Sequence, residues 1–174
     1  MNTVLEELVP SLNGRLENLG TVLLIYRGDI MVEILLSYAI LLYVGLVSDA
    51  EYKEILDTYF LKHPDNALLI ELEWRTFDIE GTIKMIFDYC LENNVNYDTF
   101  GCFFISKLEE IYYQYDMDIQ SFGSKMYSIW TLLPSEIDNK EPFWTLCYAD
   151  DSLSWGDEKQ TRELYQKMFQ YYKE

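Results

Sequence analysis

Residues 30–47, IMVEILLSYAILLYVGLV, constrain the fold more than any other stretch, because they are nearly all apolar apart from Glu33 and Ser37. The charge-free part, from Ile34 to Val47, is 14 residues long, whereas a membrane-spanning helix needs about 20. No cluster of Lys or Arg flanks the stretch to orient it in a bilayer. A helix that is hydrophobic all round is buried, so we expect a central helix wrapped by others and no membrane insertion.

The chain after residue 47 has the spacing of amphipathic helices. Ser48 and Glu51 match a capping box, in which each side chain bonds the other residue's backbone N–H. Pro64 ends that helix at His63, since the residue before a proline avoids the α region. We expect Asp65 and Asp78 to cap the next two helices, and later helices at about 98–115, 118–133 and 157–173. The expected core includes Leu68, Leu69, Leu72, Trp74, Ile83, Ile86, Phe87, Cys90, Leu91, Phe100, Phe104, Phe122, Met126, Trp130, Tyr165 and Phe169.

The whole of 1–174 is expected to form one all-α domain, a bundle of six to eight mostly antiparallel helices joined by short connections. Residues 21–35, TVLLIYRGDIMVEIL, are ambiguous. They fit either a continuous helix or a short β-hairpin that turns at Arg27-Gly28-Asp29. We favour the helix.

A long aromatic and acidic segment, residues 134–156, precedes the last helix and shows no helical pattern. Loops of this length are uncommon in compact domains and are usually functional or packed by their own side chains. We expect Phe143, Trp144 and Leu146 to pack inward. The candidates for binding a partner are Tyr148, Asp150, Asp151, Trp155, Asp157 and Glu158. An alternative remains open, in which all the aromatic side chains pack inward and the acids are merely solvated.

The charge balance, 30 acids against 13 bases, gives a formal net charge of -17. Nucleic-acid binding needs clustered Lys and Arg, so we expect none. The same field would attract a basic protein partner, although acidity also serves solubility alone. Three cysteines without C-x-x-C spacing argue against a disulfide scaffold or zinc site and favour the cytoplasm. Glu6 and Glu7 occupy the place where an export signal carries basic residues, so we expect no export.

Signatures of catalysis are absent from the sequence. His63 is the only histidine, and no nucleophile motif accompanies it. No glycine-rich phosphate-binding loop occurs. The acid pairs at 116–118 and 150–151 could bind a hard cation, but acids at helix junctions also cap helices. We therefore expect no enzyme, no cofactor and no metal site.

These features together are typical of an acidic inhibitor of a basic protein. Bacterial immunity proteins and antitoxins that neutralise nuclease toxins share this composition, which is an analogy and not a family match. The expected mechanism is occlusion of the toxin's cationic cleft. Two alternatives remain: a helical adaptor or scaffold protein with a neutral partner, and a carboxylate-dependent metalloenzyme. The sequence does not indicate an oligomeric state.

Overall fold

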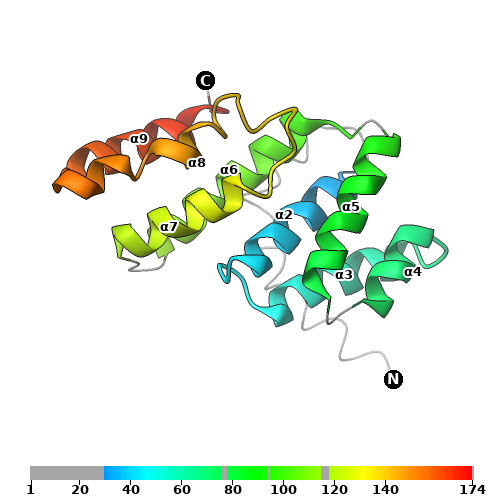
Figure 1. Ribbon diagram of the computed structural model, residues 1–174. Helices are drawn as coiled ribbons and strands as arrows, with labels where there is room; N and C mark the ends of the chain where they lie inside the picture. Colours follow the sequence, from blue (N-terminus) through cyan, green and yellow to red (C-terminus); the bar gives the residue numbers. More distant parts are fainter. Residues whose placement is uncertain (1–29, 76–77, 94, 115–117, 174) are drawn as a thin grey trace. The chain divides into compact units, whose positions relative to one another are not determined.

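The computed structural model describes residues 30–75, 78–93, 95–114 and 118–173. Across them the fold is all-α, with no strand, which confirms the expected fold class. The elements are α2 (Met31–Tyr43), α3 (Asp49–Lys62), α4 (Ala67–Trp74), α5 (Ile79–Asn93), α6 (Tyr97–Gln114), α7 (Ile119–Trp130), α8 (Thr145–Tyr148), the 3₁₀-helix η1 (Asp151–Trp155) and α9 (Glu158–Gln170). All of them belong to one compact unit, Met31–Glu174 (Figure 1).

Helix α2 is the central helix expected from residues 30–47. Helices α3, α5 and α6 all pack against it, and Leu35, Leu36 and Ile40 are fully buried. The two polar interruptions are buried as well, and the Ser37 hydroxyl donates to the backbone carbonyl of Glu33 at 2.7 Å. No helix among the described residues is long and apolar enough to cross a membrane.

The ambiguous stretch 21–35 is described only in its last part. Residues 31–35 form the first turns of α2, as the helical alternative expects. Arg27-Gly28-Asp29 and the residues before them lie outside the described part of the chain. The expectation of a single domain over 1–174 accordingly stays a prediction.

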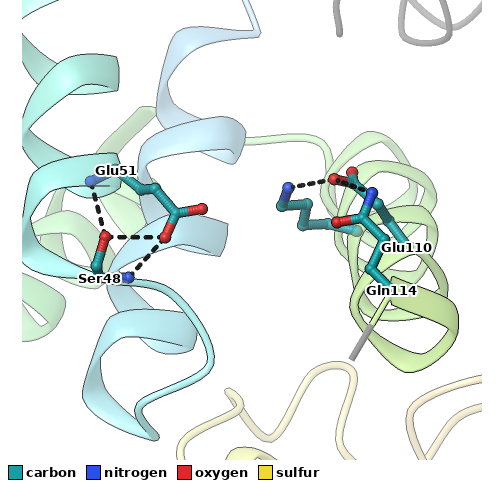
Figure 2. Close-up of polar contacts among 5 residues, drawn as sticks. Ser48, Glu51, Glu110 and Gln114 are labelled. Atoms are coloured by element: carbon teal, nitrogen blue, oxygen red, sulfur yellow. Dashed lines mark hydrogen bonds and ion pairs between the residues drawn. The ribbon is translucent and has the colours of Figure 1, made fainter. Parts of the chain in front are cut away.

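The capping box at the start of α3 is confirmed (Figure 2). The Ser48 backbone N–H donates to Glu51 Oε2 at 2.8 Å, and the Glu51 N–H donates to Ser48 Oγ at 3.3 Å. Helix α3 ends at Lys62 and is capped by His63, directly before Pro64. Reciprocal capping satisfies two backbone donors that the first turn of a helix leaves without partners.

The caps of the next two helices are confirmed in one case and wrong in the other. Asp78 Oδ1 accepts from the Gly81 N–H at 2.9 Å at the start of α5, as expected. Helix α4 is capped by Asn66 instead of Asp65, with Asn66 Oδ1 accepting from the Leu69 N–H at 3.2 Å. The helix begins at Ala67, so the capping position immediately before it belongs to Asn66.

Two expected core residues, Trp74 and Leu91, lie outside the core, and two others, Phe87 and Trp130, are only partly buried against it. Trp74 is 86% exposed, because it lies two residues past Leu72 and so about 200° around α4. Leu91 is 64% exposed. The buried side chains of α5 are Thr82, Ile83, Ile86 and Cys90, and Leu91 lies about 100° further around the helix than Cys90.

Helix α6 joins the helices around α2 to those at the C-terminal end, since it packs against both α2 and α9. An aromatic cluster forms the second contact: the Tyr112 ring of α6 lies 5.0 Å from Phe122 of α7 and 5.3 Å from Phe169 of α9. Tyr165 is fully buried in the same cluster. This cluster thus joins α6, α7 and α9.

Candidate partner-binding surface

The segment from residue 136 to residue 158 concentrates negative charge. Its seven acids are Glu136, Asp138, Glu141, Asp150, Asp151, Asp157 and Glu158, and its only base is Lys140. The excess is therefore six negative charges (7 − 1) within one stretch that packs against α7 and α9. Such a stretch attracts cationic groups over roughly 10 Å at 0.1 M salt.

The expectation that residues 134–156 lack helical structure is wrong, because α8 and η1 both lie within them. Phe143, Leu146 and Ala149 recur every three residues and are buried, with exposed fractions of 2%, 0% and 0%. Phe143 stacks on Phe100 of α6 with ring centroids 5.8 Å apart. The segment has an inner face with helical spacing, which packs it onto the bundle.

Trp144 belongs to the opposite, outer face. Phe143 and Leu146 pack inward as expected, but the same expectation for Trp144 is wrong, since 39% of this residue is exposed. A helical turn places Trp144 about 100° around from Phe143, away from the inner face. Tyr148, four residues further on, lies on the same side as Trp144 and is half-buried.

Four aromatic side chains form a continuous series across this outer face, which we call the aromatic row. Ring centroids are 5.7 Å apart for Tyr127–Trp130, 6.0 Å for Trp130–Trp144 and 6.2 Å for Trp144–Tyr148. Tyr127 is 48% exposed, and the Trp130 indole N–H donates to the Asp138 carbonyl at 2.9 Å. The row is therefore held in place while part of its ring surface faces water.

Glu141 lies at the Tyr148 end of the aromatic row. The Thr145 hydroxyl donates to Glu141 Oε2 at 2.6 Å. The Tyr148 hydroxyl donates to Glu141 Oε1 at 3.4 Å. Both oxygens of this exposed carboxylate are thus oriented by neighbouring hydroxyl groups.

Asp150 is a partner candidate that the structure places against the bundle. A Cβ on Gly123 of α7 would lie 2.6 Å from Asp150 Cβ, so this close approach requires glycine. Burial raises the pKa of the Asp150 carboxyl, and the charge of Asp151 raises it further. Burial also raises the pKa of the Tyr165 hydroxyl, with the Asp150 carboxylate adding to the effect. Asp150 is half-buried, so part of its side chain packs against α7 and part faces solvent.

The remaining candidates, Asp151, Trp155, Asp157 and Glu158, are all exposed and form what we call the acidic corner, between η1 and α9. Trp155 is 67% exposed at the end of η1. Gly156 ends η1 with a φ of 83°, a conformation that favours glycine, and so separates η1 from α9. The corner presents a large aromatic side chain to solvent among carboxylates.

Two members of the acidic corner also support α9. Asp157 Oδ1 accepts from the Gln160 N–H at 3.0 Å and caps the helix. Glu158 pairs with Arg162 one turn later, with Oε2 and Nη2 3.5 Å apart. Negative charge at a helix N-terminus is favourable, so these residues have a structural role beside any role in binding.

The cysteines show no feature of a reactive site. All three are free thiols. Burial raises the pKa of Cys90 to about 12, with the nearby Glu33 adding to the rise. Burial also raises the pKa of Cys102 and Cys147. A raised pKa lowers the fraction of thiolate, which is the nucleophilic form.

In the described ranges, no three His, Cys, Asp or Glu side chains lie close enough to hold a metal ion. Of the acid pair at 116–118, only Asp118 is described, and it caps α7 by accepting from the Ser121 N–H at 3.0 Å. The absence of a metal, a cofactor and an activity stays a prediction.

Comparisons of the chain with protein-family models, with curated proteins and with solved structures give no match. The candidate surface therefore rests on its own geometry: an aromatic row with an oriented carboxylate, and an acidic corner with an exposed tryptophan.

Proposed function

We propose that this chain is an acidic inhibitor that binds and occludes a basic protein, in the manner of an immunity protein or antitoxin. The observation that carries the proposal is Trp155, 67% exposed among the exposed carboxylates of the acidic corner. Interface hot spots are enriched in tryptophan side chains that become desolvated in the complex. The surrounding charge would speed association with a cationic surface.

The proposed mechanism is occlusion of a cationic cleft. A nuclease binds phosphates with Lys and Arg side chains, and those groups are the natural targets of clustered carboxylates. Asp151 and the aromatic row supply the acidic and apolar parts of the contact. We place this activity in the cytoplasm, because the reducing cytoplasm keeps thiols free and all three cysteines are free thiols.

The test is a pull-down from the source cells with the immobilised protein, at about 0.05 M and about 0.5 M salt, since exposed charges are screened as salt rises. We expect a basic protein to be retained at low salt and lost at high salt. Trp155→Ala should abolish retention, whereas Trp74→Ala, the matched control on α4, should retain the partner. Retention that is equal at both salts would contradict the proposal.

One observation favours a second candidate, a helical adaptor that binds a neutral partner. Ile70 and Trp74, one turn apart on α4, are 38% and 86% exposed. Leu61 near the end of α3 is 76% exposed. If α4 provides the contact, retention should be insensitive to salt, abolished by Trp74→Ala and unaffected by Trp155→Ala.

A further inference from the structure

Trp144 offers part of its ring to a ligand. Its two aromatic neighbours are both inclined to it, Trp130 at 71° and Tyr148 at 45°, so neither stacks flat on the indole. With 39% of the residue exposed, an indole surface remains open to solvent. The face of an indole ring is the best aromatic partner for a cation.

Glu141 supplies a carboxylate that is hydrogen-bonded to two neighbours of Trp144. Thr145 follows Trp144 in the chain, and the Tyr148 ring lies next to the Trp144 ring. The hydroxyl group of each donates a hydrogen bond to one oxygen of Glu141. A carboxylate has about four acceptor positions, so two hydroxyl donors leave positions for a further donor. None of the ion pairs found within the described residues uses Glu141. The carboxylate is therefore oriented but without a cation from those residues.

The charge around the aromatic row points to a cationic occupant. Asp138, whose backbone carbonyl accepts from the Trp130 indole, adds to the charge of Glu141, and Lys140 is the single base between residues 134 and 156. An apolar occupant would gain contact with the rings and would leave the Glu141 carboxylate without a counter-charge. A cation with a planar apolar face satisfies both features at once.

We propose that Trp144 and Glu141 form a seat for an arginine side chain. The guanidinium group lies over the Trp144 indole and donates to Glu141, whose oxygens Thr145 and Tyr148 hold in place. Arginine fits better than lysine because its guanidinium is planar, weakly hydrated, able to stack and able to donate two parallel hydrogen bonds. This inference rests on the proposed function and names the chemical group by which the basic partner is recognised.

The experiment uses the full chain labelled with 5-fluorotryptophan. Trp74, Trp130, Trp144 and Trp155 account for all four tryptophans, so each gives one fluorine signal that single substitutions assign. The protein is titrated with end-blocked octa-arginine and with octa-lysine, peptides of equal charge, at about 0.15 M salt to limit non-specific attraction. We expect octa-arginine to shift the Trp144 signal and to bind about threefold or more tightly than octa-lysine, with the Trp74 signal unchanged.

Glu141→Gln and Glu136→Gln provide a matched pair, because each removes one exposed carboxylate from the same segment. Glu141→Gln should abolish the preference for arginine over lysine, and Glu136→Gln should preserve it. Equal shifts of Trp144 by both peptides would overturn the seat. An equal effect of the two variants on the preference would also overturn it. Far-ultraviolet circular dichroism of each variant verifies that the fold is retained.

The seat and the proposed function fail separately. If octa-arginine shifts Trp144 selectively but the pull-down yields no basic protein, the seat stands and the inhibitor proposal fails. If a basic partner is captured and Glu141→Gln leaves its dissociation rate unchanged, the inhibitor proposal stands and the seat fails.

Discussion

Phe143→Ala and Trp155→Ala should have clearly different effects on stability, although both remove a large aromatic side chain from the same segment. Phe143 is 2% exposed and stacks on Phe100, so its removal empties a core site. Trp155 is 67% exposed, and Gly156 beside it has open space around it. The comparison tests whether the segment has a packed inner face and a solvent-facing outer face.

The magnitudes follow from the buried areas. A phenylalanine buries about 200 Å², which at about 25 cal/mol per Å² gives an upper limit of about 5 kcal/mol. Emptied aromatic sites usually cost about 3–5 kcal/mol, and we expect about 4 kcal/mol for Phe143→Ala. About one third of Trp155 is buried, or about 80 Å², so its removal should cost at most about 2 kcal/mol.

Urea unfolding followed by far-ultraviolet circular dichroism measures both values, provided that the slope with urea is the same in each variant. For a chain of this size, about 4 kcal/mol also lowers the melting temperature by about 10 °C. A cost for Trp155→Ala equal to that for Phe143→Ala would refute the reasoning. Trp155 would then be part of a packed belt, and the acidic corner would lose its anchor.

Three further predictions concern the bundle and its ionisable groups. Ile86 is fully buried and Leu91 is 64% exposed, so Ile86→Ala should cost about 2–5 kcal/mol of unfolding free energy and Leu91→Ala about 0.5 kcal/mol or less. Similar urea midpoints for the two variants would contradict the assigned face of α5. Because burial raises the pKa of Asp150, the folded state binds this proton more tightly than the unfolded state, so wild-type stability should fall as pH rises through the raised pKa, and Asp150→Asn should lack that fall. Urea midpoints of both proteins from pH 4 to pH 8 measure the difference, and an equal fall in the variant would contradict the sign. Cys90 is 3% exposed and its pKa is raised to about 12, so it should react with a thiol reagent only after unfolding, whereas the half-buried Cys147 should react in the folded state. Labelling of Cys90 in the folded protein, detected by mass spectrometry, would contradict its burial.

The helical fold could be predicted because its signals are local. The run around Leu36 and Ile40 is apolar on all sides, and such a run has one stable position in a helical bundle, the centre. The Ser48 capping box is equally local, since both partners lie within one turn. Exact capping positions were less secure: Asp65 and Asn66 are both good caps, and only the start of α4 decides between them.

The candidate surface was predicted less well because it depends on contacts between distant residues. Trp130 reads as a core residue of α7, and only the fold shows that its ring meets Trp144 of the later segment. A signal for the outer face was present in the sequence: Trp144 and Tyr148 are four residues apart, and Phe143 and Leu146 three apart. The packing of Asp150 against Gly123 has no comparable signal, since it joins α7 to a residue 27 positions later (150 − 123).

The central claim is that charge brings a basic partner to this surface and that aromatic side chains hold it there. The most direct measurement is the association and dissociation kinetics of the captured partner at several salt concentrations. We expect the association rate to fall steeply with salt, since exposed charges are screened over roughly 10 Å at 0.1 M. Replacing Asp151, Asp157 and Glu158 by Asn or Gln should mainly lower the association rate, whereas Trp155→Ala should mainly raise the dissociation rate. An association rate that does not change with salt, in the wild-type protein, would contradict the account.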